Sequence, residues 1–280
     1  MHLRTVGICG SVPGPDSPAS CYLLTVTADE VAACVASGAL SGDAEIRDWN
    51  IVVDLGNGSM GPLIKYLDAN QIDAVLISHL HGDHFADLSA LYVHLKHNPV
   101  YGSAITGVPS GIRIWGPEGI DERARRVTVD LSKDMTVLRA NIWTDGQTIN
   151  IGPFAISVKL VYHMVECFAM RIVGPSSVKL GECAVLAYTG DTDYCDNIIE
   201  ISRDADVLLA EAAYVEGRDL LPGIHLSGAG AGRVATEAGV KQLILTHIPP
   251  WNDPDVALAE ALTTYSGPTC LAVPEGLHII

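Results

Sequence analysis

One nine-residue stretch, residues 77–85, constrains this chain more than any other part of its sequence. It reads Ile-Ser-His-Leu-His-Gly-Asp-His-Phe and places His79, His81, Asp83 and His84 within six residues. An apolar, strand-like run precedes it and a helical pattern follows it. Zinc and similar metals bind imidazole nitrogen and carboxylate oxygen at about 2.0–2.2 Å, so these residue types at this spacing favour a metal site over a histidine-rich surface loop.

The spacing within this stretch also predicts how the side chains are presented. Alternation turns His79 and His81 to one side of an extended strand end, and Asp83 and His84 fall in the turn that follows. Two metal ions about 3.5–4 Å apart need more ligands than a single tetrahedral site. Because this stretch supplies only four candidates, further ligands are expected from other parts of the chain.

The His-x-His-x-Asp-His pattern at the end of a strand resembles the signature of the metallo-β-lactamase-fold hydrolases. The resemblance implies an α/β fold, a four-layer αββα sandwich of two packed sheets with helices outside. Strand-like runs followed by alternating strands and helices occur twice along the chain, which agrees with this architecture. We expect a single domain over residues 1–280, with the Ala-rich, acidic residues 28–49 as a surface insertion.

Three other strand ends carry ligand types in the order His163, Asp191 and His247, which matches the superfamily. The resemblance implies two divalent ions per chain: one bound by His79, His81 and His163, the other by Asp83, His84 and His247, with Asp191 bridging both. A hydroxide held between the ions would be the nucleophile, because metal binding lowers the pKa of water towards about 7. Zinc suits these ligands, and iron and manganese accept similar sets.

Two further features near these ligands have expected or open roles. Asp54, at the end of strand-like residues 51–54, resembles an aspartate that orients the ligand loop without binding metal. His94 and His97 lie three residues apart on an expected helix over residues 86–97. They either approach the mouth of the pocket or lie exposed on that helix, and the sequence leaves both interpretations open.

His225 and Glu211 narrow the chemistry within the superfamily. His225 lies in Gly-Ile-His-Leu-Ser-Gly, before a small-residue helix over residues 229–238 for which Ser227 is the expected cap. The segment is similar to a His-x-Ser/Thr element of the phosphodiesterase branch, which includes the tRNA 3′-end endonucleases and the class II cyclic-nucleotide phosphodiesterases. Glu211 stands at the place of the glutamate that pairs with this histidine, and such a pair can donate a proton to a leaving alkoxide. Asp83, Glu211 and His225 are therefore the candidate catalytic residues.

The segments Gly-Pro-Asp-Ser-Pro-Ala-Ser near the start and Thr-His-Ile-Pro-Pro-Trp near the end resemble actinobacterial atypical class II cyclic-nucleotide phosphodiesterases. This resemblance implies hydrolysis of a 3′,5′-cyclic nucleotide, with cAMP favoured, to the 5′-monophosphate. Processing of tRNA 3′ ends is an alternative, but it needs a flexible arm that residues 164–190 leave no space for. A thioesterase or lactonase would give His225 and Glu211 no role. A metal-binding scaffold with a degenerate site would be missing a metal ligand or the acid, and this sequence is missing neither.

Charge and cysteine usage bear on partners and compartment. The formal net charge of −16 repels phosphate backbones, although metal ions can invert the local field for a small phosphate ester. Seven scattered cysteines without a Cys-x-x-Cys pair are typical of reduced thiols. With no signal-like start and no run of eighteen apolar residues, we expect a cytoplasmic protein without membrane or nucleic-acid partners. The branch commonly dimerises, so a homodimer is expected.

Overall fold

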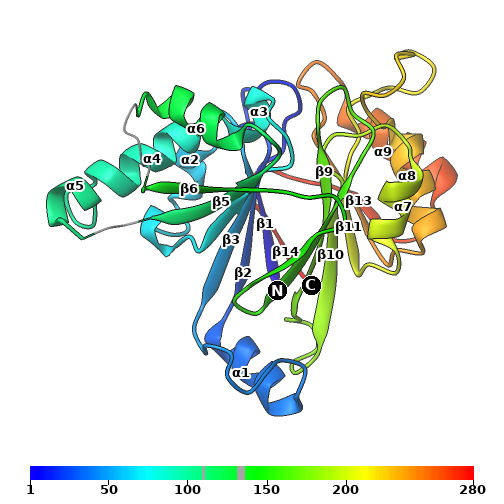
Figure 1. The fold of residues 1–280 in the computed structure, drawn as a ribbon. Coiled ribbons are helices and arrows are strands. Elements are labelled where there is room, and N and C mark those ends of the chain that lie inside the picture. The colour runs from blue at the N-terminus through cyan, green and yellow to red at the C-terminus, as the bar shows by residue number, and fades with distance from the viewer. Residues whose placement is uncertain (109–110, 131–135) are drawn as a thin grey trace.

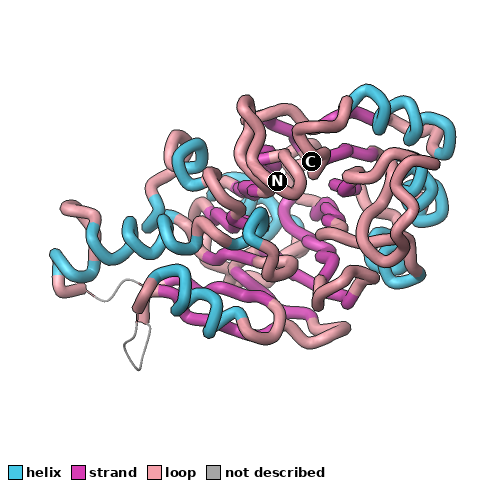
Figure 2. The backbone as a smooth tube through the Cα atoms, turned by 90° about the horizontal axis from the view of Figure 1, so that it is seen from above, coloured by secondary structure: helices cyan, strands magenta, loops and turns pink. Residues whose placement is uncertain are grey.

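Two seven-stranded sheets packed against each other form the centre of the computed structural model, which describes residues 1–108, 111–130 and 136–280 (Figures 1 and 2). The first sheet contains, in spatial order, β14 (Gly276–Ile279), β1 (His2–Gly7), β2 (Cys21–Val26), β3 (Trp49–Leu55), β4 (Ala74–Leu76), β5 (Ile112–Gly116) and β6 (Leu138–Ile142). The second contains β13 (Thr269–Leu271), β12 (Leu243–Thr246), β11 (Val207–Glu211), β10 (Cys183–Tyr188), β9 (Phe168–Pro175), β8 (Phe154–Leu160) and β7 (Thr148–Ile151).

In each of the two sheets, the strands pair antiparallel on one side and parallel on the other. Strands β14 to β3 and β7 to β10 pair antiparallel, whereas β3 to β6 and β10 to β13 pair parallel. Parallel neighbours require long crossovers, and these carry the helices. On the first sheet the helices are α2 (Met60–Leu63), η1 (Ala69–Gln71), α3 (Gly82–Phe85), α4 (Leu88–His97), α5 (Ser103–Thr106) and α6 (Ile120–Thr128). On the second they are α7 (Asp196–Ser202), α8 (Gly228–Ala238) and α9 (Pro254–Thr264). This arrangement confirms the αββα sandwich.

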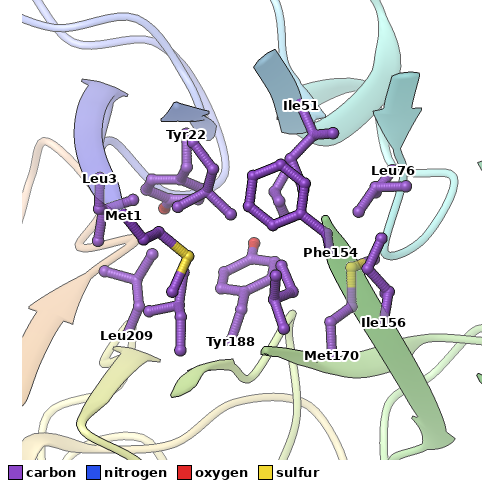
Figure 3. Packing of buried hydrophobic residues seen from close by; sticks show 14 of the residues in the cluster. Met1, Leu3, Tyr22, Ile51, Leu76, Phe154, Ile156, Met170, Tyr188 and Leu209 are labelled. Atoms are coloured by element: carbon purple, nitrogen blue, oxygen red, sulfur yellow. The ribbon is translucent and has the colours of Figure 1, made fainter. Parts of the chain in front are cut away.

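Alternating side chains along the strands build three apolar clusters. Leu76 of β4 and Leu209 of β11 point inward to the cluster between the sheets, shown with its aromatic residues in Figure 3. Their neighbour Val75 packs under the helices of the first sheet, and Leu208 packs under those of the second. Successive strand residues face opposite sides of a sheet. Strands that are apolar at every position are therefore typical of sheets covered on both faces.

Residues 28–49, the expected surface insertion, contain the helix α1 (Ala28–Ser37). A capping box between Thr27 and Glu30 starts the helix, and Val31 and Cys34 are fully buried. The Ser37 hydroxyl donates to the carbonyl oxygen of Gly181 at 2.6 Å, which joins the helix to the turn between β9 and β10. In Figure 1 α1 lies at the end of the sandwich opposite α3, far from the His-rich turn.

The segment between β3 and β4 contains only the short helices α2 and η1, and Gly61 and Pro62 fall inside α2. The strand β14 was not anticipated, because its side chains are half-exposed and its partner β1 lies at the other end of the chain. None of the helices in the described parts of the chain has the length and hydrophobicity that spanning a bilayer requires.

Candidate metal centre and active site

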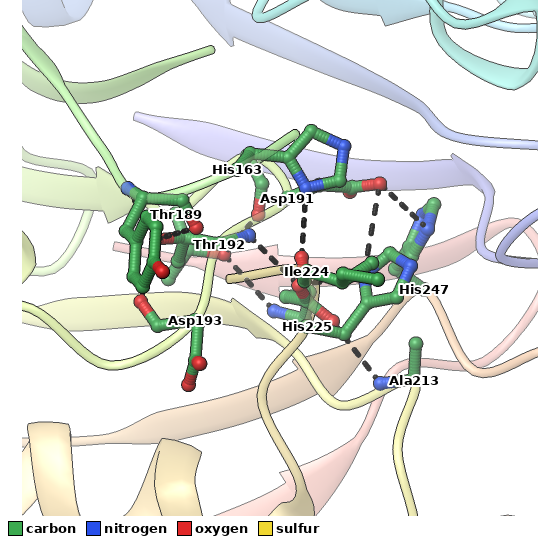
Figure 4. Close-up of polar contacts among 12 residues, drawn as sticks. His163, Thr189, Asp191, Thr192, Asp193, Ala213, Ile224, His225 and His247 are labelled. Carbon is green, nitrogen blue, oxygen red and sulfur yellow. Dashed lines mark hydrogen bonds and ion pairs between the residues drawn. The ribbon is translucent and has the colours of Figure 1, made fainter. Parts of the chain in front are cut away.

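All seven predicted metal ligands lie just beyond strand ends, at the edge where the two sheets meet. The segment from His79 to His84 follows β4, His163 follows β8, Asp191 follows β10 and His247 follows β12. Figure 4 shows His163, Asp191 and His247 facing one another across this edge. Residues separated by as many as 168 positions, from His79 to His247, therefore converge on one small volume.

The first group, here called the open donor set, contains His79, His81, His163 and Asp191. His81 Nδ1 lies 2.9 Å from His79 Nε2 and 3.3 Å from His163 Nε2. Asp191 Oδ2 lies 3.6 Å from His79 Nε2. Ligand atoms about 2.0–2.1 Å from a tetrahedral ion lie about 3.3 Å from one another, so these separations match a metal site. His79 and Asp191 are buried, whereas His81 and His163 are half-buried.

The second group, here called the buried donor set, contains Asp83, His84, His247 and again Asp191. Asp191 Oδ1 lies 3.3 Å from His84 Nε2, and its Oδ2 lies 3.2 Å from His247 Nε2. Asp83 Oδ2 lies 3.5 Å from His84 Nε2 and 3.7 Å from His247 Nε2. All four side chains are buried. Asp191 thus reaches both groups, with Oδ2 near His79 and His247 and Oδ1 near His84, as a bridging ligand would.

Buried atoms that lack a hydrogen bond test whether these residues fit a metal ion. In the described part of the chain, His84 Nε2, His247 Nε2 and Asp191 Oδ1 are buried without a hydrogen-bond partner. Burying a polar atom without a hydrogen bond costs about 1–3 kcal/mol, so native structures seldom retain several such atoms at one point. A cation within the buried donor set would satisfy all three atoms together. The residues present therefore fit a metal ion.

The pKa values of the open donor set favour the ligand form of its histidines. Burial lowers the pKa of His79 well below its ordinary value and also lowers the pKa values of His81 and His163. Neutral imidazole is the form that binds metal, because the lone pair must be free. The three imidazoles are therefore prepared to bind without first losing a proton.

In the buried donor set, carboxylates and histidines shift one another's pKa values. Burial opposes ionisation of Asp191, but His247, His84 and His79 outweigh it and hold the Asp191 pKa well below its usual range. Burial also disfavours charge on His84, yet Asp191 and Asp54 raise the His84 pKa well above its ordinary value. A cation bound at His84 Nε2 would displace the proton there, which makes metal affinity at this set dependent on pH.

Asp54 organises the buried donor set from behind, as the sequence predicts. Its carboxylate accepts hydrogen bonds from Ser78 N at 2.7 Å, Ser78 Oγ at 2.8 Å and Tyr188 Oη at 2.6 Å. It also lies 2.7 Å from His84 Nδ1, which leaves His84 Nε2 directed at the donor set. Asp54 adopts a left-handed backbone conformation, with φ of 54°, an uncommon conformation that aspartate tolerates better than most residues.

Several supporting groups were missed by sequence reasoning. Ser20 Oγ lies 2.8 Å from His247 Nδ1, and the carbonyl oxygen of Ile224 lies 2.7 Å from His163 Nδ1. A serine in a loop and a backbone carbonyl carry no sequence signal. Gly10 was a weak sequence signal for this contact. A Cβ at this position would lie only 2.2 Å from the carbonyl oxygen of His247, and only glycine fits such a close approach.

The predicted acid pair lies beside Asp191. His225 Nδ1 is 2.9 Å from Glu211 Oε1. It also lies 3.9 Å from Asp191 Oδ2 (Figure 4). Glu211 accepts hydrogen bonds from the backbone amides of Thr192 at 2.8 Å and Ala213 at 3.1 Å. Burial disfavours the charged form of His225, but Glu211 outweighs it and raises the pKa of His225 to about 9.

His94 and His97, whose role the sequence leaves open, do not join this constellation. Both lie on α4, and neither belongs to a group of metal-ligand residues among the described residues. His97 is exposed and His94 half-buried.

Together, the two packed sheets and the histidine–aspartate cluster at their common edge define a metallo-hydrolase of the metallo-β-lactamase fold. A family model described as the beta-lactamase superfamily domain matches residues 50–248, and the chain belongs to this family.

Similar proteins extend over nearly the whole chain. An uncharacterized protein of Mycobacterium tuberculosis, Rv1339, is 35% identical over 270 residues, which cover 96% of this chain and 88% of the relative. The probable metallo-hydrolase YhfI of Bacillus subtilis is 29% identical over 272 residues, 97% of each chain. The crystal structure of YhfI superposes with a TM-score of 0.78, covering 99% of this chain and 98% of the other. A ribonuclease Z of Picosynechococcus is 27% identical over 246 residues, 70% of this chain and 74% of that protein.

Proposed function

We propose that this metallo-hydrolase is a phosphodiesterase that hydrolyses 3′,5′-cyclic nucleotides, with cAMP favoured, to the 5′-monophosphate. The observation that carries the proposal is the His225–Glu211 pair, with His225 Nδ1 3.9 Å from the carboxylate shared by both donor sets. A charged imidazole held beside the reaction centre is the group that departure of an alkoxide requires. The similarity to a ribonuclease, an enzyme that acts on phosphodiester bonds, supports the same class of bond.

The two donor sets would hold two divalent ions, with zinc favoured, whose charge would bind the phosphate and lower the pKa of water to produce the nucleophile. The protein contributes position and a proton. Glu211 occupies Nδ1 of His225, which leaves Nε2 as the atom that donates a proton to the leaving oxygen. The amides of Thr192 and Ala213 fix Glu211, so that the pair is oriented before substrate arrives.

RNA processing is the second candidate, because ribonuclease Z is among the similar proteins. The net charge of −16 opposes it, since an RNA chain brings many phosphates to the surface. Residues 164–190, which would have to contain an RNA-binding arm, are occupied by β9, β10 and their turns. A thioesterase or lactonase would leave the His225–Glu211 pair without a task.

A substrate panel separates these activities. The purified protein with its metal ions would be assayed with 3′,5′-cyclic AMP and GMP, 2′,3′-cyclic AMP, bis(p-nitrophenyl) phosphate, a thioester and a precursor tRNA. We expect the highest kcat/KM with a 3′,5′-cyclic nucleotide. Turnover of the thioester alone, or cleavage of the precursor tRNA without turnover of cyclic nucleotides, would contradict the proposal.

His225→Ala tests the role of the acid. We expect kcat for cyclic AMP to fall by about 10²- to 10⁴-fold, the usual contribution of a general acid, while metal content stays near two ions per chain. His97→Ala is the matched control, because His97 lies exposed on α4 outside the site, and its activity should equal that of the wild type. Loss of metal from His225→Ala would make His225 a ligand and overturn its assignment as the acid.

A further inference from the structure

We propose that a pocket beside His225 holds the nucleoside part of the substrate and that Tyr214 is its principal contact. The proposal rests on the proposed function. The pocket, here called the His225 pocket, measures about 390 Å³, and its walls include Asp193, Tyr194, Tyr214, Leu221, His225 and Arg233. This volume falls within the range of about 300–1,000 Å³ that is typical of small-molecule sites.

Reaction chemistry places the nucleoside on this side of the metal centre. Hydrolysis of a 3′,5′-cyclic nucleotide breaks the bond from phosphorus to O3′, and O3′ takes up a proton while water supplies the new oxygen on phosphorus. The proton donor must therefore reach O3′, which is bonded directly to the ribose. Because His225 is the donor and also lines the pocket, the ribose and its base lie in or against the pocket.

Tyr214 is a residue of the pocket, next to the acid, whose polar group remains available. Its ring lies edge-on to His225, with centroids 5.2 Å apart and an interplanar angle of 73°. Its backbone amide donates to the carbonyl oxygen of Leu226 at 3.0 Å, which fixes the residue beside the acid. Within the described residues its hydroxyl forms no hydrogen bond, so it can bind the ribose or the base. Its half-buried ring offers an apolar face to a base.

The other walls are held in place by contacts among themselves. Arg233 covers one face of the Tyr194 ring at 4.0 Å, and the Tyr194 hydroxyl donates to Glu237 at 2.6 Å. The loop over residues 215–224 is fastened where Asp193 accepts the amide of Gly223 at 2.7 Å. The pocket is therefore formed before a ligand arrives, which reduces the entropy cost of binding.

The charge of the pocket favours a nucleoside over a longer nucleic acid. Asp193, Glu216 and Asp219 line it together with Arg233 and the charged imidazole of His225. Carboxylates tolerate the uncharged, donor-rich base and ribose of a cyclic nucleotide, whereas they would repel the next phosphate of an RNA chain. The same wall that admits a nucleoside thus disfavours a polynucleotide.

A second hollow beside the site, lined in part by His81, Glu118, Val165 and Glu166, is the competing location. It adjoins the open donor set and lacks the acid. A nucleoside bound there would leave O3′ on the side away from His225, which the reaction does not allow. Val165 is the side chain through which this alternative can be tested, because it is 40% exposed in that hollow.

The experiment compares two diesters, one with a nucleoside and one without. KM and kcat would be measured with 3′,5′-cyclic AMP and with methyl p-nitrophenyl phosphate for the wild type, Tyr214→Leu, Tyr214→Phe, Val165→Ala and Tyr101→Leu. Tyr101 packs against the helical layer of the first sheet and serves as a matched tyrosine control. Metal content and circular dichroism would establish that each variant is folded and loaded.

We expect Tyr214→Leu to raise KM for cyclic AMP about tenfold, the loss typical of one aromatic contact to a base. Its kcat/KM ratio of cyclic AMP to methyl p-nitrophenyl phosphate should fall by the same factor. Tyr214→Phe, which keeps the ring, should raise KM less, and Val165→Ala and Tyr101→Leu should keep the wild-type ratio.

Two results would overturn the inference while the proposed function stands. In the first, Tyr214→Leu loses equal activity on both diesters, as a merely structural role would cause. In the second, Val165→Ala raises KM for cyclic AMP and Tyr214→Leu does not. If the wild type instead hydrolysed methyl p-nitrophenyl phosphate but no cyclic nucleotide, the proposed function would fail and the inference with it.

Discussion

The open and buried donor sets share Asp191 yet differ in exposure and support. In the open set two of three histidines, His81 and His163, are half-buried, whereas every member of the buried set is enclosed. The buried set is supported by the Asp54 carboxylate behind His84 and by Ser20 behind His247. In the open set Ser78 Oγ lies 3.1 Å from His79 Nδ1, and the backbone carbonyl of Ile224 supports His163.

This difference suggests a division of labour between the two halves of the centre. A carboxylate behind an imidazole fixes its orientation and raises its basicity, and both effects strengthen metal binding. We therefore expect the buried set to bind its metal ion more tightly, and the open set to be the side that substrate and water reach. Asp191 couples the two because its Oδ2 faces His79 of the open set and His247 of the buried set, while its Oδ1 faces His84.

Asp191→Asn should give the largest effect, because it changes the ligand common to both sets. An amide offers one neutral oxygen where the carboxylate offers two charged ones, so metal content should fall from two ions to fewer than one per chain. Diester hydrolysis should fall more than about a hundredfold, beyond the usual loss for an outer partner. Elemental analysis and kinetics with bis(p-nitrophenyl) phosphate would measure both quantities, and two retained ions would show that Asp191 is no bridge.

Asp54→Asn should produce a smaller loss, greatest at the buried set, because Asp54 contacts His84 directly and reaches His79 only through Ser78. Asparagine tolerates the left-handed backbone at this position, so the substitution removes charge with little strain. We expect about a 10- to 100-fold weaker affinity for one of the two ions, as measured by competition with a metal indicator. Ser20→Ala is the companion variant, with a smaller loss expected because a hydroxyl supports His247 less than a carboxylate supports His84. Equal weakening of both ions would remove the distinction between the sets.

The order of metal release should show the smallest effect. With excess chelator, the ion of the open set should leave in a faster phase and that of the buried set in a slower one, because His81 and His163 are reached by solvent. Absorbance of a chromogenic chelator would record the two phases. A single phase that releases both ions would contradict the division between an open and a buried set.

Much of the fold was predictable from the sequence because most strands are recognisable as short apolar or alternating runs. Runs such as Ala74–Leu76 and Val207–Glu211 are buried on both faces and end at or just before residues of the site, so the strands and the site residues support each other's assignment. The strand β14 was not predictable, because it is short, half-exposed and stabilised by pairing with β1.

The ligand positions were predictable for a related reason. Strand ends in the resembling family present His and Asp at fixed points, and the structure brings the corresponding residues together. The groups that orient these ligands were not predictable, because Ser20 and the Ile224 carbonyl act through tertiary contacts that no local sequence pattern encodes. Metal identity, a cytoplasmic location and a homodimer remain predictions from the sequence.

Anomalous diffraction from crystals of the protein grown with zinc tests the central claim most directly. We predict two peaks about 3.5–4 Å apart, one within bonding distance of His79, His81 and His163 and the other of Asp83, His84 and His247. Asp191 should touch both ions, and His225 should touch neither. A single peak, or a zinc ion bound by His225, would contradict the dinuclear assignment and the role of His225 as the acid.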